Sequence, residues 1–262
     1  MGGGEFRRRG GALLLSLAFV TTARFAAGDE AGEARRYADC TAQAGAAPAA
    51  ALDAARAWEA EGGGGPARHC AALALIGLDR PAEAAQRLGE LGAELTAARP
   101  TLAAEALGQA GQAWLLAGQA ERALAAQDAA LALAPDDVEL RIDRSLALAL
   151  VGAYRRALDD LDLAQALAPD RAEVLVLRAS AHRLLDEPAA ALADIERALT
   201  LAPQDPEALL ERGMSRRLAG DDSGARADWQ AVLALAPDGA VAEAARANLA
   251  RLNGDRVGPV AE

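Results

Sequence analysis

The side chains best suited to covalent or metal chemistry are two cysteines, Cys40 and Cys70, and two histidines, His69 and His182. Two thiols can form a disulfide, stay apart as small buried side chains, or bind a metal. Two cysteines with one histidine leave a structural zinc site short of a ligand, and the Cys-x-x-Cys spacing of redox-active pairs is absent. In an oxidising compartment we therefore expect a disulfide, with two separate thiols as the alternative.

No arrangement of residues for catalysis stands out in the sequence. Neither histidine has a nearby nucleophile, and paired carboxylates cannot be told from the ordinary charges of helix surfaces. The glycine run at 62–65 is not followed by the lysine and the serine or threonine that a phosphate-binding loop requires. The sequence therefore predicts no enzyme activity, no cofactor and no metal; an enzyme would need a site assembled between distant segments.

The amino terminus has the order of a secretory signal peptide. Three arginines at 7–9 precede an apolar run at 11–20, which small residues follow up to Gly28. We expect residues 1–28 to direct secretion by the general route, so that the remaining chain is periplasmic. The alternative is an uncleaved anchor in the inner membrane, which the short run and Arg24 disfavour because a bilayer core is about 30 Å thick.

Composition predicts an all-α protein that does not bind nucleic acid. The chain has 262 residues, of which 52% are hydrophobic and only 3% are aromatic. Alanine and leucine dominate the apolar residues, and both favour helices, whereas the β-branched and aromatic residues that favour strands are scarce. The formal net charge is −11, which disfavours a partner held by a basic surface.

A fixed period of 34 residues organises the second half of the chain. Prolines recur at this spacing, and glycines at 118, 152 and 220 lie 17 residues before three of them. This spacing predicts that each unit forms a helix, a tight turn and a second helix that ends before the proline. Such units stack because no single unit can bury its apolar face. The four prolines are Pro135, Pro169, Pro203 and Pro237.

The chain resembles the tetratricopeptide repeat family, which has small residues at the eighth, twentieth and twenty-seventh positions of each unit and proline at the thirty-second. The units 104–137, 138–171, 172–205 and 206–239 fit this pattern, with Val232 as the departure. The resemblance implies a right-handed superhelix of stacked helix-turn-helix units. The small residues are Gly111, Ala123 and Ala130; Ser145, Ala157 and Ala164; Ala179, Ala191 and Ala198; and Gly213 and Ala225.

The flanking segments extend this pattern. We expect two divergent units over 29–103, a capping helix over 240–253 and a flexible tail over 254–262. In the register of the divergent units, Cys40 and Cys70 lie on the first helices of neighbouring units. That placement permits a disulfide between them.

Arginines at the seventh position and aspartates at the twenty-third recur in three units. Folding each unit about its turn brings these two positions together, so we predict structural ion pairs between its two helices. A row of arginines that binds an anionic ligand is the alternative. The predicted pairs are Arg144 with Asp160, Arg178 with Asp194, and Arg212 with Asp228.

The family resemblance implies a concave groove, lined by the first helix of each unit, that binds a peptide or a helix of another protein. The lysine and asparagine set by which some members hold a terminal carboxylate is missing. The alternative is that the groove residues pack against neighbouring helices. The predicted groove residues are Ile142, Leu146 and Leu150; Val176, Ser180 and Arg183; and Leu210, Met214 and Arg217.

Together these features predict a non-enzymatic scaffold of the bacterial periplasm whose partner is another protein. An assembly or regulatory subunit of an envelope complex, attached to the inner membrane through a retained amino terminus, is the alternative. Membrane contact is expected only in that second case.

Overall fold

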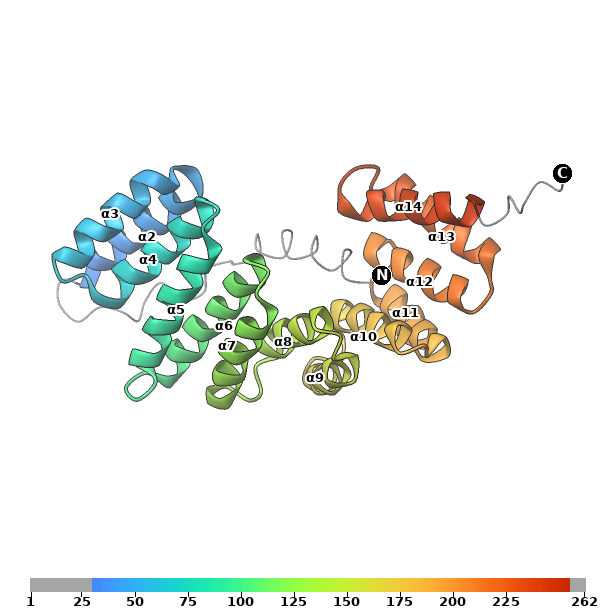
Figure 1. Cartoon of the computed structure of the whole chain (residues 1–262), viewed down its shortest axis with the longest axis horizontal. Coiled ribbons are helices and arrows are strands. Elements are labelled where there is room, and N and C mark those ends of the chain that lie inside the picture. Colours follow the sequence, from blue (N-terminus) through green and yellow to red (C-terminus); the bar gives the residue numbers. More distant parts are fainter. Residues whose placement is uncertain (1–29, 255–262) are drawn as a thin grey trace. The chain divides into compact units, whose positions relative to one another are not determined.

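The computed structural model describes residues 30–254, which form helices and no strands (Figure 1). The predicted signal peptide and residues 255–262 lie outside the described residues. The expected all-α fold of stacked helical hairpins is confirmed. The helices are α2 (Glu30–Ala46), α3 (Pro48–Ala60), α4 (Gly64–Gly77), α5 (Pro81–Leu95), α6 (Pro100–Leu116), α7 (Ala120–Leu133), α8 (Val138–Leu150), α9 (Tyr154–Leu167), α10 (Ala172–Leu184), α11 (Pro188–Leu201), α12 (Pro206–Leu218), α13 (Asp222–Leu235) and α14 (Ala240–Gly254).

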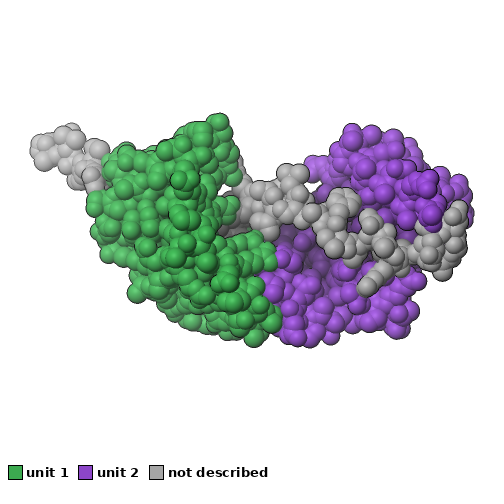
Figure 2. Space-filling model, turned by 180° about the vertical axis from the view of Figure 1, so that it is seen from behind, with its two compact units in different colours: residues 1–9, 148–262 green, residues 10–147 purple. Residues whose placement is uncertain are grey.

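The described chain divides into two compact units (Figure 2). The N-terminal unit comprises residues up to Ala147 and holds α2 to α7 with most of α8. The C-terminal unit begins at Leu148 and holds α9 to α14.

Within each unit, helices adjacent in sequence pack as antiparallel hairpins. In the N-terminal unit α2 packs on α3 and α4, and α5 lies between α4 and α6. In the C-terminal unit α10 packs on α11 and α12 on α13, while α10, α12 and α14 also contact one another in succession. We call α4, α6, α8, α10 and α12 the first helices, because each opens a hairpin.

The turns inside the hairpins need a left-handed residue. Gly118, Gly152 and Gly220 have φ values of 71°, 77° and 87°, a conformation that glycine adopts without steric cost. Asp186 takes the same place in the α10–α11 turn with a φ of 62°, and Asp79 does so in the α4–α5 turn with a φ of 57°. Aspartate tolerates this conformation better than most side chains.

Small residues let the paired helices approach closely, as the eighth-position pattern predicts. A Cβ atom added at Gly213 of α12 would lie 2.4 Å from the Trp229 Nε1 of α13. A Cβ atom added at Gly111 of α6 would lie 2.6 Å from the Gln127 Cγ of α7. The two glycines are therefore matched to large side chains on the facing helix.

Helix ends differ from the predicted unit boundaries at several points. Helix α6 begins at Pro100, whereas the predicted unit begins at Ala104. The predicted units 138–171, 172–205 and 206–239 open with the first residues of α8, α10 and α12. Helix α14 includes Gly254, which we had expected in the tail.

Candidate partner-binding surface on the first helices

Four of the nine predicted groove residues are buried inside the array. Their exposed fractions are 4% or less, so none of these side chains can touch a partner while the helices stay packed. Ser180 also accepts a hydrogen bond of 3.4 Å from Arg183 Nη2 on the same helix. These residues pack against neighbouring helices, as the alternative interpretation expects. They are Ile142, Val176, Ser180 and Leu210.

The other five predicted groove residues are half-buried and reach the surface. Leu146 and Leu150 lie on α8, Arg183 on α10, and Met214 and Arg217 on α12. On the first helices these five predicted groove residues are therefore the ones that a partner could touch.

Arg183 also has a structural role between two first helices. Its Nε donates a hydrogen bond to Glu211 Oε1 on α12, and its Nη2 lies 3.4 Å from Glu211 Oε2. The Glu211 side chain is fully buried, so the arginine neutralises a carboxylate that would otherwise be unstable there. The positive charge of Arg183 is therefore partly neutralised by Glu211 within the packed helices.

Three further apolar residues of the N-terminal unit lie on first helices but were not among the predicted groove residues. Leu73 and Ile76 of α4 and Leu115 of α6 are half-buried. Counted from Gly65 and Ala104, they occupy the ninth and twelfth positions, where the unit 206–239 has the predicted groove residues Met214 and Arg217. With Leu146 they give the first helices of the N-terminal unit a partly exposed apolar set.

A chain of hydrogen bonds connects α2, α4 and α6 in the N-terminal unit. Tyr37 Oη of α2 lies 2.7 Å from His69 Nδ1 of α4, and His69 Nε2 lies 2.6 Å from Gln109 Oε1 of α6. With Nε2 donating to Gln109 and Nδ1 accepting from Tyr37, the ring is neutral. One helix further on, Gln112 Nε2 donates to Asp143 Oδ2 of α8 at 2.8 Å.

Burial shifts the pKa values of the two titratable groups in this series of hydrogen bonds. Loss of solvent lowers the pKa of His69, although the hydrogen bond to Gln109 opposes that shift. Burial, assisted by the negative charge of Glu105, raises the pKa of Tyr37 to about 12. Both groups are thus held neutral at ordinary pH, as a buried polar chain requires.

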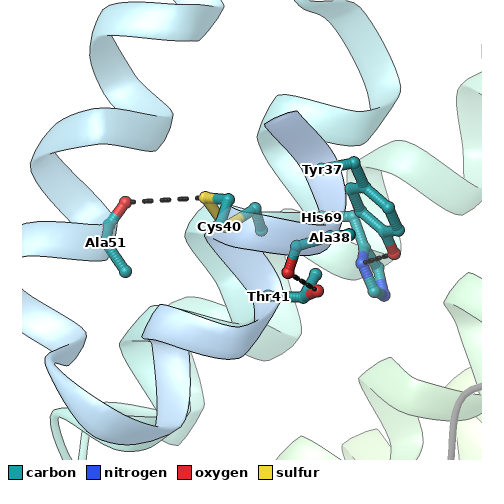
Figure 3. Close-up of a disulfide and its surroundings, with 7 residues drawn as sticks. Tyr37, Ala38, Cys40, Thr41, Ala51 and His69 are labelled. Carbon is teal, nitrogen blue, oxygen red and sulfur yellow. Dashed lines mark hydrogen bonds between the residues drawn. A yellow bond between two sulfur atoms is a disulfide. The ribbon is translucent and has the colours of Figure 1, made fainter. Parts of the chain in front are cut away.

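A disulfide joins Cys40 of α2 to Cys70 of α4, with 6.1 Å between their Cα atoms (Figure 3). His69 and Cys70 are neighbours in the chain, so the disulfide and the hydrogen bond from Tyr37 connect the same two helices. Neither Cys40 nor Cys70 is exposed by more than 7%.

The predicted arginine–aspartate pairs lie close together where one unit contains both partners. Arg212 Nη2 lies 2.7 Å from Asp228 Oδ1, and Arg178 Nε lies 3.3 Å from Asp194 Oδ2. Arg144 and Asp160 share the repeat unit 138–171 but lie in different compact units, so their pairing stays a prediction.

The same arginines also form ion pairs with a second set of acidic residues, which lie on the preceding hairpin and were not among the predicted pairs. Asp128 Oδ1 lies 2.7 Å from Arg144 Nη1, and Asp162 Oδ1 lies 3.3 Å from Arg178 Nε. Glu196 Oε1 lies 3.6 Å from Arg212 Nη1. These acids recur every 34 residues, which is the signal that identifies them in the sequence. The arginines therefore contact acids from successive hairpins and support stacking.

Among residues 30–254, no three His, Cys, Asp or Glu side chains gather where they could hold a metal ion. None of the helices in this part of the chain is long and apolar enough to cross a membrane.

Comparisons with known proteins found similar folds and one family match. Residues 112–182 match the family model described as tetratricopeptide repeat. No curated protein matches the sequence.

Three solved structures illustrate the similarity. MamA from Desulfovibrio magneticus, residues 41 to the end, has a TM-score of 0.57 at 22% identity, covering 65% of this chain and 94% of that one. The thermophilic protein TTC0263 from Thermus thermophilus has a TM-score of 0.55 at 22% identity, covering 69% and 94%. A tetratricopeptide repeat protein from Parabacteroides merdae has a TM-score of 0.60 at 17% identity, covering 70% and 71%.

Fold and hairpin stacking together define a helical-repeat protein. Residues 112–182 match the tetratricopeptide repeat family, and the described helices have the same fold as solved tetratricopeptide repeat structures.

Proposed function

We propose that this protein is a non-enzymatic periplasmic scaffold that binds a segment of another protein on its first helices. The observation that carries the proposal is the recurrence of half-exposed apolar side chains at ligand positions of successive first helices. Within each unit, successive helices of this kind present a row of contact points, and repeat arrays use such surfaces to bind peptides and helices.

The chemistry of the two units points to an apolar partner segment. In the N-terminal unit the candidate contacts are Leu73, Ile76, Leu115 and Leu146, all of them aliphatic. In the C-terminal unit Met214 is available on α12, and its flexible thioether adapts to irregular partners. A partner helix with one apolar stripe, or an extended peptide with spaced aliphatic residues, fits these surfaces.

Two features support the periplasm as the place of action. Residues 1–28 have the order of a secretory signal, and the Cys40–Cys70 disulfide suits an oxidising compartment. Mass spectrometry of the first residue of the protein from its native envelope tests this part. A chain that begins after residue 23 or 28 supports a periplasmic scaffold, and a chain that retains the apolar run supports the membrane-anchored alternative.

The binding surface can be tested with charge substitutions. Peptides are first selected from a random library on the purified chain, and their affinities are then measured by calorimetry. Leu146→Glu and Met214→Glu are each expected to weaken binding at least about tenfold, because a carboxylate cannot be desolvated at an apolar contact.

Leu163→Glu is the matched control. Leu163 is 49% exposed but lies on α9, a second helix, so its substitution is expected to leave affinity unchanged. Circular dichroism and melting curves check that each variant is folded. Equal binding by all three folded variants would show that the first helices are not the binding surface.

A further inference from the structure

Helix α2 stands out because it buries few side chains. Among residues 31–46 only Cys40, Thr41 and Ala44 are buried, and the core cluster of this region takes only Cys40 and Ala44 from α2. Helix α4, by comparison, buries residues along most of its length. Burial of apolar surface therefore holds α2 only weakly.

The noncovalent polar contacts of α2 add little to this attachment. Arg36 lies 2.7 Å from Glu61, but both side chains are largely exposed, and such ion pairs contribute little. Arg36 also lies 5.0 Å from the ring centroid of Trp58 on α3. The hydrogen bond between Tyr37 and His69 is better shielded, and Cys40 Sγ lies 3.9 Å from the Ala51 carbonyl oxygen of α3. The disulfide is the strongest connection between α2 and the rest of the unit.

Helix α2 covers an apolar face made by α3 and α4. Cys40 and Ala44 share one core cluster with Leu52 and Ala55 of α3 and with Leu75 of α4. Without α2, this face would lose its cover on one side.

From this arrangement we propose that the Cys40–Cys70 disulfide is a redox latch. In the oxidised chain it keeps α2 packed on α3 and α4; in the reduced chain α2 detaches and uncovers their apolar face. A dithiol performs the reduction: its thiolates break the Sγ–Sγ bond through a mixed disulfide. Two electrons and two protons reach Cys40 and Cys70, and the dithiol becomes a cyclic disulfide.

Burial of both sulfurs gives the latch a defined order of events. Cys40 is 7% exposed and Cys70 is fully buried, so a dithiol reaches the bond only after a brief opening of α2. Once the bond is broken, the opening is no longer opposed by the covalent link. The latch thus couples the state of α2 to the redox state of the compartment.

Hydrogen exchange of the full chain tests the latch. Protection of the backbone amides in peptides from 30–46 is compared with and without dithiothreitol. A disulfide commonly contributes about 2–4 kcal/mol, which corresponds to an expected loss of protection of about 30- to 700-fold. Peptides from α12 and α13 serve as the internal reference and are expected not to change.

A paired variant separates the bond from side effects of the reagent. The double substitution Cys40→Ala and Cys70→Ala is expected to show fast exchange in α2 without dithiothreitol and no further change when it is added. If the variant does not fold, the reduced wild-type chain still decides the question. Equal protection of α2 in the oxidised and reduced wild-type chains would overturn the proposal.

Discussion

Arg212 Nη2 of α12 lies 2.7 Å from Asp228 Oδ1 of α13, and the Asp228 side chain is only 4% exposed. Arg216 Nη1 donates to the other carboxylate oxygen at 2.8 Å. Two guanidinium groups therefore neutralise one buried carboxylate. On its solvent side, Arg212 also faces Glu196, whose side chain is 59% exposed. The same arginine thus has one buried and one exposed acidic neighbour.

This pair of neighbours gives a sharp stability prediction. Asp228→Ala is expected to lower the free energy of unfolding by about 3–5 kcal/mol, because it leaves two partly buried guanidinium groups without their carboxylate. Glu196→Ala is expected to change the free energy of unfolding by about 0.5 kcal/mol or less, because an exposed ion pair is screened by water. Urea denaturation measures both values. Similar losses in the two variants would contradict the assignment of the buried carboxylate as the main partner.

Gln127 of α7 is a buried polar residue without a hydrogen-bond partner among residues 30–254. Its side chain is fully buried, and both its Oε1 and its Nε2 are unsatisfied. At the equivalent place in the next two units the chain has Leu161 and Ile195. Gln127→Leu is therefore expected to raise the free energy of unfolding by about 1–2 kcal/mol, since it removes an amide that lost its water on folding.

Gln127→Ala is expected to change the free energy of unfolding in the opposite direction. It removes the same amide but leaves a cavity beside Gly111, so a lower free energy of unfolding is expected. Thermal and urea denaturation of both variants check the pair. A lower stability of Gln127→Leu would mean that the amide is satisfied in solution.

The sequence predicted the fold well because the fold depends on local, repeated features. Prolines and left-handed turn residues at fixed spacing mark the helix ends, and small residues mark the close helix crossings. The second set of acidic residues was missed because each ion pair was sought inside one unit, whereas Asp128 and Asp162 contact arginines of the following hairpin. Burial of Val176 and Leu210 agrees with the alternative interpretation, between which and partner binding the sequence does not decide, because family positions do not say which side chains the next helix covers.

The hydrogen bonds that connect Tyr37, His69 and Gln109 could not be predicted from the sequence, for a different reason. Tyr37 and His69 come from the divergent units and Gln109 from the unit 104–137, and their separations of 32 and 40 residues share no periodic spacing. Only packing of α2, α4 and α6 brings the three side chains together.

His69 makes stability depend on pH in a predictable direction. Burial lowers its pKa in the folded chain below the unfolded value of about 6.5. Above that value His69 is neutral in both states. As the pH falls below it, the unfolded chain binds a proton that the folded chain resists, so the free energy of unfolding decreases until the folded pKa is passed.

The measurement is urea denaturation at a series of pH values from about 7.5 to 5, spanning the ordinary histidine pKa. His69→Gln is expected to flatten the decrease, whereas His182→Gln, which changes the half-buried histidine of α10, is expected to retain it. An unchanged pH dependence in His69→Gln would show that other groups cause the decrease.

The close contact between Gly213 and Trp229 allows a direct test of helix packing. Trp229 is 1% exposed, and its Nε1 donates to the Leu210 carbonyl at 3.3 Å, so the ring has little room to move away from a new Cβ atom. Gly213→Ala is expected to lower the free energy of unfolding by about 1–3 kcal/mol through overpacking. Gly89→Ala in α5 is the control: nothing lies within 4 Å of its added Cβ atom. There the higher helix propensity of alanine is expected to stabilise by about 0.5–1 kcal/mol.

A double-mutant cycle identifies the cause of the Gly213 effect. Ala179 and Ile195 occupy the equivalent places in the preceding unit, which shows that alanine is accepted opposite a smaller side chain. In a Trp229→Leu background, Gly213→Ala is therefore expected to become nearly neutral, which gives a coupling energy of about 1–3 kcal/mol between the two sites. Urea denaturation of the four proteins measures this coupling. If the two substitutions were additive, the cost at Gly213 would come from the α12 backbone and not from contact with the indole ring.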